Sequence, residues 1–342
     1  MRILLVLNHP AHVHLFRNFI YYLQEKGHHF TVATRDKDIT HTLLDHYGIP
    51  YHSLSKPYGG IGGMFIEMLV RDWALLRMHR KYRFDIAFGT DVSTTHLTLF
   101  KNVPSYTFCE DDDDVVHLYA LAAYPFATKV VNPACLRYKY FKSKRLLHNS
   151  YHKLAYLHPD FFTPDEAVIR KYGLSPFSYI IIRNSALKAH HDIGAKGLSG
   201  EAWDRVNKVI KNYPQITSRE GVTSQKIEPW DMHHVLAFSK MIISDSLSMS
   251  VEAAVLGVPA IRYNSFVGRI SVLNELENKY DLTYGFNAKD SESTTAMIRK
   301  IEELLAIAHL PEIWQEKRKK MLSEKINLTT WMIDLFNNII TA

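Results

Sequence analysis

Short apolar runs alternate with amphipathic stretches along the first half of the chain. An apolar run at 3–7 is followed by a polar loop at 8–12, and then by a helical pattern that places Leu15, Phe19 and Leu23 on one face. This order of elements is typical of parallel strands joined by crossover helices. The pattern predicts about six strands in this half, at 3–7, 29–33, 51–54, 85–88, 105–108 and 129–131, with helices at 39–47 and 64–80.

The second half repeats the pattern after a proline-marked stretch at 158–176, which we interpret as a linker. Strands are predicted at 179–182, 215–218, 241–243 and 259–262, and helices at 202–212, 231–238 and 248–256, with three more between 292 and 341. The predicted fold class is α/β, with two doubly wound, Rossmann-like domains. We expect an N-terminal domain at 1–160, a C-terminal domain at 174–325, and a last helix at 326–342 that packs back on the first domain.

The composition is that of a packed globular protein, with 46% hydrophobic and 22% charged residues. The only two cysteines, Cys109 and Cys135, exclude a disulfide scaffold and a four-cysteine zinc site. A net charge of +6 favours anionic partners such as nucleotides, lipid surfaces or nucleic acid, without choosing among them. The pattern of a signal peptide and that of a membrane span are both missing, so we expect a cytoplasmic protein.

The most specific segment is 241–259, MIISDSLSMSVEAAVLGVP. An apolar strand leads into a helix whose N-terminus offers backbone N–H groups, and hydroxyl groups gather there, which suits a phosphate or pyrophosphate. The residues concerned are Ser246, Ser248, Met249 and Ser250, and Glu252 is placed one turn into the helix to accept hydrogen bonds from ribose hydroxyls. The alternative is a helix capped by Ser246 or Ser248, with Glu252 completing a capping box. The sequence leaves both interpretations open.

Several stretches of the sequence resemble known protein families. The stretch SDSLSMSVEAAVLGVPAI resembles the donor-binding segment of GT-B glycosyltransferases and of the related UDP-N-acetylglucosamine 2-epimerases, matching it in the serine-rich loop, Glu252, Leu256, Gly257 and Pro259. It departs from the epimerases at 246–248, where they usually have a Ser-Gly-Gly type of run. The stretches NHPAHVHLFRNF, PFATKVVNP and YHKLAYLHPDFFTPD resemble the bacterial and archaeal family DUF354, which is grouped with the GT-B superfamily. This second resemblance covers nearly the whole chain.

The resemblance implies a GT-B-like fold, in which the two domains face each other across a cleft. It implies a glycosyltransferase that takes a nucleotide-sugar donor, first of all a UDP-sugar, and a glycan or lipid-linked acceptor in cell-surface polysaccharide synthesis. No tightly bound cofactor and no metal are expected. One alternative is a 2-epimerase or hydrolase that acts on a UDP-sugar without an acceptor. A nucleic-acid binder is the other, although no recognised nucleic-acid motif is present.

The polar loop after the first strand carries candidates for the acceptor side. Ligands of open α/β sheets bind at the carboxyl ends of the strands, so we expect Asn8, His12 and His14 to line the cleft. A neutral imidazole there can remove the proton of an acceptor hydroxyl, because histidine titrates near cellular pH, and His12 is the first candidate. The alternative is that one of these histidines caps the helix or packs against the sheet.

Five carboxylates follow one another at 110–114, directly after a predicted strand. Three interpretations are open: a catalytic carboxylate at Glu110 or Asp111, a divalent metal site, or a cluster at the N-terminus of a helix that begins at Val115. In the epimerases that the chain resembles, a carboxylate in this part of the chain takes part in catalysis, and this favours Glu110.

Two strand ends of the second domain carry candidates for donor binding. Arg183 and Asn184 close the first strand of that domain, and a guanidinium can pair with phosphate through two hydrogen bonds. Arg219 ends the next strand, which in GT-B folds lies near the nucleotide base. Lys188 and the residues at 190–192 follow the first of these strands, and a zinc site at 190–192 is rejected because adjacent residues rarely ligate one metal.

The helical stretch at 64–83 has apolar residues at helical spacing and a basic end. One interpretation is that it lies on an anionic membrane, at the inner face, and brings the enzyme to a lipid-linked acceptor. The alternative is a core helix with a solvated basic end. The basic run at 317–320 is interpreted as a solvated helix face.

Overall fold

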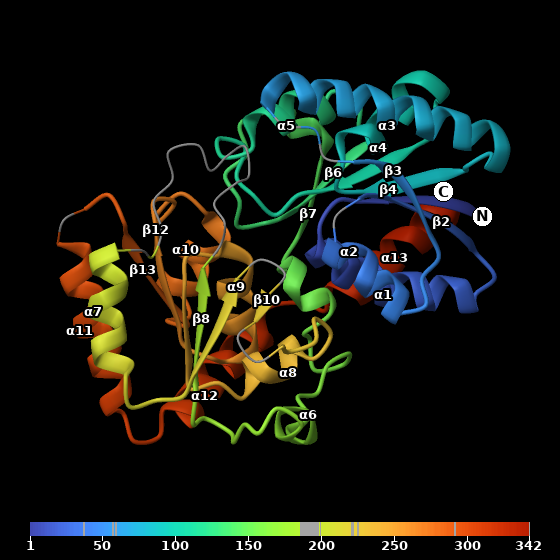
Figure 1. Cartoon of the computed structure of the whole chain (residues 1–342). Helices are drawn as coiled ribbons and strands as arrows, with labels where there is room; N and C mark the ends of the chain where they lie inside the picture. The colour runs from blue at the N-terminus through green and yellow to red at the C-terminus, as the bar shows by residue number, and fades with distance from the viewer. Residues whose placement is uncertain are drawn as a thin grey trace. The chain divides into compact units, whose positions relative to one another are not determined.

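The computed structural model describes residues 1–36, 38–56, 58, 60–184, 198, 200–219, 222–223, 226–290 and 292–341 (Figure 1). The chain divides into two compact units. The first unit consists of Met1–Tyr156 and Ile326–Ala342, and the second of Leu157–Lys325. Each unit has one sheet of its own.

The first unit is built on a seven-stranded sheet in the order β3-β2-β1-β4-β5-β6-β7, in which every neighbouring pair is parallel. The strands are β1 (Arg2–Leu7), β2 (His29–Arg35), β3 (Tyr51–Ser55), β4 (Ile86–Gly89), β5 (Ser105–Phe108), β6 (Lys129–Pro133) and β7 (Arg145–His148). The apolar run that begins β1 is explained by its central place, because helices cover both faces of a parallel sheet and each residue from Ile3 to Leu7 is fully buried.

The helices of the first unit form two layers, one on each face of the sheet (Figure 1). One layer holds α1 (Pro10–Glu25), α2 (Asp38–His46) and α13 (Leu328–Thr341), and the other holds α3 (Gly60–Tyr82), α4 (Val92–Lys101) and α5 (His117–Ala123). The short 3-10 helices η1 (Lys142–Lys144) and η2 (His152–Ala155) complete this unit.

The last helix of the chain belongs to the core of the first unit. The Phe336 ring of α13 lies with its centroid 6.2 Å from that of Phe19 and 6.3 Å from that of Phe88. The Thr329 hydroxyl of α13 donates to the carbonyl of Ala155 at 2.7 Å. These contacts join the two ends of the sequence in one hydrophobic core.

The second unit is built on a six-stranded sheet in the order β10-β9-β8-β11-β12-β13. Its strands are β8 (Ile180–Asn184), β9 (Gln215–Arg219), β10 (Val222–Thr223), β11 (Met241–Ser244), β12 (Ala260–Asn264) and β13 (Thr283–Asn287); all pairs are parallel except β9 with β10. Its helices are α6 (Glu166–Arg170), α7 (Gly200–Ile210), α8 (Met232–Ala237), α9 (Leu247–Leu256), α10 (Ser271–Asn278), α11 (Ser293–Ala306) and α12 (Leu310–Glu324).

The predicted α/β fold class is confirmed. In the second unit the prediction missed β10, β13 and α10, so its sheet has six strands rather than four. The first sheet has seven strands rather than about six, because β7 begins with Arg145, whose guanidinium is neutralised by Asp113. The helix α4 was not predicted, because most of its buried residues are polar: Ser93, Thr94, Thr95 and His96 are buried together with Leu97.

Candidate functional site

In each sheet, the strand order reverses next to the first strand of the unit. The chain places β2 and β3 on one side of β1 and places β4 and the later strands on the other side. In the second unit, β9 and β10 lie on one side of β8, and β11 to β13 lie on the other. Open α/β sheets bind ligands at such a switch point, outside the carboxyl ends of the two strands. The residues to consider therefore follow β1 and β4 in one unit, and β8 and β11 in the other.

The switch point of the first unit holds a polar cluster around His12. Nδ1 of His12, in the first turn of α1, lies 2.6 Å from the hydroxyl of Thr90, which directly follows β4. When the Nδ1–H group donates to Thr90, Nε2 of the same ring carries the lone pair that a general base needs. His12 is half-buried, so its ring is held by the protein and still reaches the surface.

Asn8 and Asp91 tie the ends of β1 and β4 together beside that pair. The Asn8 amide donates to the carboxylate of Asp91, which also accepts from the backbone N–H of Ser93 at 2.8 Å and thereby caps α4. The guanidinium of Arg71 lies 3.3 Å from the same carboxylate. The carboxylate therefore orients Asn8 and the start of α4. Thr90 and Asp91 were not predicted as site residues, although their position directly after a strand was a usable signal.

His14 lies in the core, and the prediction that it lines a cleft is wrong. It is only 5% exposed, and its ring centroid lies 5.2 Å from that of Tyr156 and 5.9 Å from that of Tyr47. Two residues along an α-helix correspond to a rotation of about 200°, so His12 and His14 point to opposite sides of α1. His9, in turn, caps this helix by accepting from the N–H of Ala11 at 3.2 Å.

Glu110 holds the 3-10 helix η2 in place. One of its carboxylate oxygens accepts from the backbone N–H of His152 at 2.5 Å, and the other lies 2.7 Å from the ammonium of Lys153. Burial by itself raises the pKa of Glu110, but the charge of Lys153 and the two hydrogen bonds outweigh it and leave the pKa below its ordinary value. A carboxylate with a lowered pKa is a weak proton acceptor, so this geometry favours a structural role for Glu110.

The next acidic residues organise the loop between β6 and β7. Asp112 accepts from the backbone N–H of Arg137 at 2.8 Å, and Asp113 accepts from the N–H groups of Lys139 and Tyr140 at 2.6 and 2.9 Å. Both side chains are almost completely buried. Because these backbone groups lie about 25 residues further along the chain, the loop is fixed by contacts that no local pattern reveals.

The other interpretations of the acidic run find less support. Helix α5 begins at His117, two residues later than predicted, and its N-cap, Val116, makes no side-chain capping bond, so the capping interpretation is wrong. Asp111 is half-buried beside Cys109, whose thiol donates to the Asp111 carbonyl at 3.7 Å. Within the described parts of the chain, no three His, Cys, Asp or Glu side chains come together as a group that could hold a metal ion.

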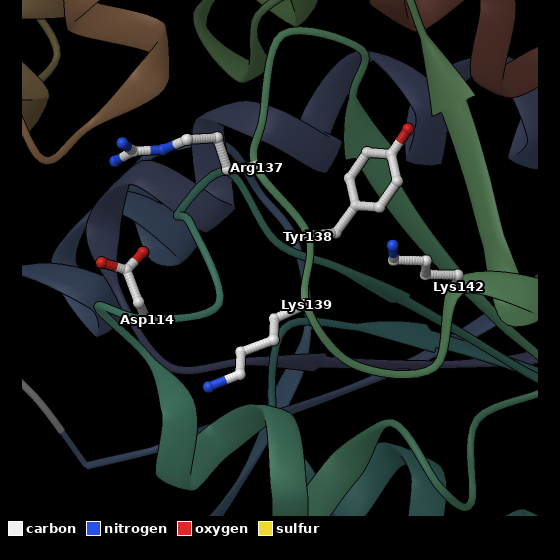
Figure 2. A pocket seen from close by; sticks show the side chains of 5 residues that line it. All are labelled: Asp114, Arg137, Tyr138, Lys139 and Lys142. Atoms are coloured by element: carbon white, nitrogen blue, oxygen red, sulfur yellow. The ribbon is translucent and has the colours of Figure 1, made fainter.

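A pocket of 390 Å³ opens at the loop between β6 and β7 (Figure 2). Its lining consists of Asp114, Arg137, Tyr138, Lys139 and Lys142. Three of the five are cationic, which suits an anionic group. Figure 2 shows Arg137 and Asp114 on one side of the loop, and Tyr138 and Lys142 on the other. Because these side chains do not converge, we assign no ligand to this pocket.

The switch point of the second unit is formed by a serine-rich turn between β11 and α9. Ser244 accepts from the backbone N–H of Ser246 at 2.8 Å, and Ser246 is the N-cap of α9, with its hydroxyl 3.5 Å from the N–H of Met249. The Ser248 side chain is half-buried, and its hydroxyl has no hydrogen-bond partner among the described residues. Ser250 is completely buried and donates to the carbonyl of Ser246 at 2.7 Å. The Ser250 hydroxyl is therefore used within the helix and is not available to a ligand.

Glu252 does not complete a capping box, because it stands six positions after the N-cap rather than three. Its carboxylate is about one-tenth exposed and lies 3.4 Å from Nε2 of His233 on α8. His233 was not predicted as part of this site. The motif that follows Glu252 ends the helix: Gly257 has a left-handed backbone (φ 74°), and Gln315 of α12 donates to the carbonyl of Leu256 at 2.9 Å.

Arg183 and Asn184 lie at the carboxyl end of β8, as predicted for the candidate site. The backbone of Arg183 is in register with Ser244 of β11, so the two switch-point strands end side by side. The guanidinium of Arg183 donates to the Ser218 hydroxyl at 2.8 Å, and the side-chain oxygen of Asn184 is buried with no partner among the described residues. Arg219 is the last residue of β9, and the described structure extends only to its backbone. Lys188 and the residues at 190–192 lie outside the described residues.

No family model and no curated protein matches the chain. Solved structures do match, and three span nearly all of it, each with 11% identity. They are the S. aureus MnaA protein with UDP (TM-score 0.67, covering 100% of this chain and 98% of that one), the UDP-GlcNAc 2-epimerase of Neisseria meningitidis with UDP-GlcNAc (0.64, 100% of each), and the spinosyn forosaminyltransferase SpnP (0.67, 100% of each).

The chain has the GT-B fold. At 11% identity these likenesses show the fold and leave the activity to be argued from the residues. Across the described residues, no helix has the length and apolarity needed to cross a bilayer.

Proposed function

We propose that the chain is a glycosyltransferase that takes its sugar from a nucleotide-activated donor, most directly a UDP-sugar. The serine-rich turn at the switch point of the second sheet is the observation that carries this proposal. There, the end of β11 leads into a capped helix that presents the Ser248 hydroxyl. Support comes from the fold, because structural neighbours were solved with UDP and with UDP-GlcNAc.

In this proposal the second unit, with the C-terminal domain at 174–325, binds the donor. The diphosphate takes hydrogen bonds from the Ser248 hydroxyl and from the first N–H groups of α9, where the helix dipole favours negative charge. Arg183 and Asn184 stand at the adjacent strand end and add a cation and an amide. Glu252, beside His233, accepts hydrogen bonds from the ribose hydroxyls.

The first unit, with the N-terminal domain at 1–160, supplies the general base. The hydroxyl of the acceptor substrate donates to Nε2 of His12, and Thr90 orients the His12 ring by accepting from its Nδ1–H group. As the proton moves to the imidazole, the acceptor oxygen bonds to the anomeric carbon of the sugar, and the nucleoside diphosphate leaves with the electron pair of the broken bond. The rival base is Glu110, whose ion pair with Lys153 and lowered pKa argue against it.

A stability screen with nucleotides tests the donor assignment. The protein is heated with UDP, GDP, CDP and TDP and with their sugars, and a ligand present at 100 times its Kd adds about 2.7 kcal/mol to the free energy of unfolding. We expect the uridine compounds to raise the melting temperature most. If none of these compounds raises it, the donor site proposed here is wrong.

Turnover then separates the two activities that the fold supports. A glycosyltransferase consumes the donor only when an acceptor is present, whereas a 2-epimerase or hydrolase consumes the UDP-sugar by itself. Isomerised sugar or free UDP in the absence of an acceptor would therefore establish the alternative, which the likeness to the Neisseria meningitidis epimerase keeps in view.

Three more specific parts of the proposal rest on the sequence resemblance. They are membership of DUF354, a role in cell-surface polysaccharide synthesis, and a glycan or lipid-linked acceptor. Contact with the inner face of a membrane through 64–83 is not required by the transfer chemistry, and it is proposed on separate grounds.

A further inference from the structure

The helix α3 exposes a continuous apolar stripe. The side chains concerned are Phe65 (58% exposed), Ile66 (54%), Leu69 (49%), Val70 (37%) and Trp73 (62%). Their spacing of one, four, five and eight positions places all of them on one face of the helix. A stripe of large apolar side chains that face water is unusual, and it indicates a surface that is covered in use.

The two carboxylates of α3 point inward, which is unusual for a helix at the surface. Glu67 is buried and pairs with Arg35 at 2.7 Å and with Arg71 at 2.9 Å. Asp72 is also buried and pairs with Nδ1 of His96 at 2.7 Å. These are the only two acidic residues of α3, so the exposed face of the helix carries no negative charge.

The neighbouring helices of the same layer expose further apolar side chains. Figure 1 shows α3, α4 and α5 in one layer, and contacts join α3 to α4 and α4 to α5. The exposed apolar residues that α4 and α5 add are Leu99, Phe100, Leu118 and Leu121, each between 46% and 51% exposed. Neither helix contains an acidic residue. We call these nine residues of the three helices the apolar surface.

Exposed cations lie along the same helices. Arg77, Arg80 and Lys81 stand in the last turns of α3, and Lys101 ends α4. The guanidinium of Arg77 lies 5.6 Å from the centre of the Trp73 ring, so the cationic and apolar parts are contiguous. An anionic bilayer complements such a surface, because its interior is apolar and its headgroups are negatively charged.

We propose that the apolar surface docks the protein on a bilayer that contains anionic lipids. A helix of 23 residues is about 34 Å long at 1.5 Å per residue, and because its exposed apolar residues share one face, it lies in the plane of the membrane. Trp73 sits at the headgroup level, where tryptophan is favoured, and the four cations contact lipid phosphates. This inference goes beyond the proposed transfer reaction and does not depend on it.

Vesicle sedimentation of the full chain tests the docking without any turnover. The vesicles consist of phosphatidylcholine alone or with about 30 mol% phosphatidylglycerol at low ionic strength. We expect binding to the anionic vesicles and little binding to the neutral ones. The triple variant R77Q/R80Q/K81Q should bind the anionic vesicles about 100-fold more weakly, because each cation near an anionic surface contributes about a factor of five.

A matched control and a spectroscopic readout make the result specific. The variant K208Q/K211Q/K320Q removes the same number of exposed cations from the second unit, at the end of α7, just after it and in α12, and should bind like the wild type. Trp73→Phe should keep most of the binding but remove most of the blue shift of tryptophan fluorescence that vesicles cause. Phe65→Gln combined with Leu69→Gln should abolish binding while the far-UV circular dichroism stays that of the wild type.

Three results would overturn the proposal. The first is equal binding to neutral and anionic vesicles, or none to either. The second is equal weakening by the two triple variants, which would indicate a response to net charge alone. The third is self-association in solution that Phe65→Gln with Leu69→Gln abolishes, because the surface would then join two copies of the chain. If the wild type binds no nucleotide, this counts against the proposed function but leaves the docking result unaffected.

Discussion

The ion pair between Glu110 and Lys153 offers a sharp test of the structural role assigned to this carboxylate. The side chains are 12% and 8% exposed, and the charged atoms lie 2.7 Å apart. At an effective dielectric constant of about 20, unit charges at that separation attract each other by about 6 kcal/mol, and the desolvation of both groups offsets part of this. Removal of one partner of a buried pair typically costs about 3–5 kcal/mol, because the other charge is left uncompensated.

We therefore expect Glu110→Gln to destabilise the first unit by about 3 kcal/mol at pH 7. The amide oxygen can still accept from the N–H of His152, which retains about 1 kcal/mol of the original interaction. The double variant Glu110→Gln with Lys153→Met should recover about 2 kcal/mol, since it removes the uncompensated ammonium. Urea unfolding followed by hydrogen exchange in peptides of the first unit measures these differences separately from the second unit.

The pH dependence supplies an independent check with a defined sign. The pKa of Glu110 is lower in the folded state than in the unfolded state, so its stabilisation is complete above about pH 4.3 and is lost as the pH falls through the folded value. The difference between the wild type and Glu110→Gln should shrink below pH 4. The structural role would be refuted if Glu110→Gln were as stable as the wild type at pH 7. It would also be refuted if adding Lys153→Met to Glu110→Gln recovered none of the lost stability. If the double variant is stable but inactive while His12→Ala is active, Glu110 is the base.

Four further predictions concern the site, the core and metal dependence. His12→Ala should lower turnover by about 10²–10⁴-fold with nearly unchanged nucleotide affinity, which steady-state kinetics and calorimetry measure together, and unchanged turnover would exclude His12 as the base. Glu252→Ala should weaken nucleotide binding by about 1–3 kcal/mol, and an unchanged affinity in a folded variant would reject the ribose contact. Burial lowers the pKa of His152 to about 4, so the wild type should lose up to about 3 kcal/mol of stability as the pH falls from about 6.5 toward 4, whereas His152→Phe should show a flatter profile in urea titrations at pH 7 and pH 4.5. EDTA should leave cooperative unfolding intact, and its loss after chelation would reveal a structural metal.

Elements whose signal is local could be predicted from neighbouring residues. The apolar run of β1, the strand–serine–helix order from β11 to α9, and the stop at Gly257 all follow from neighbouring residues and could be predicted within a few positions. The two Rossmann-like halves follow from the same repetition. Where the buried face is polar, as in α4, or the strand begins with a charge, as in β7, hydrophobic periodicity gave no signal.

The tertiary structure alone decided which candidate residues meet. Glu110 finds its partners about 43 residues further along the chain, Asp91 meets Asn8 from 83 residues away, and His233 reaches Glu252 from a separate helix. Such contacts depend on strand order and on the packing of helices against the sheet. No residue type or spacing within the chain encodes them. The direction of the apolar stripe on α3 is also a tertiary property. A helical period identifies a face without showing which way that face points. The pairing of Glu67 and Asp72 on the inner side of the helix turns the stripe outward.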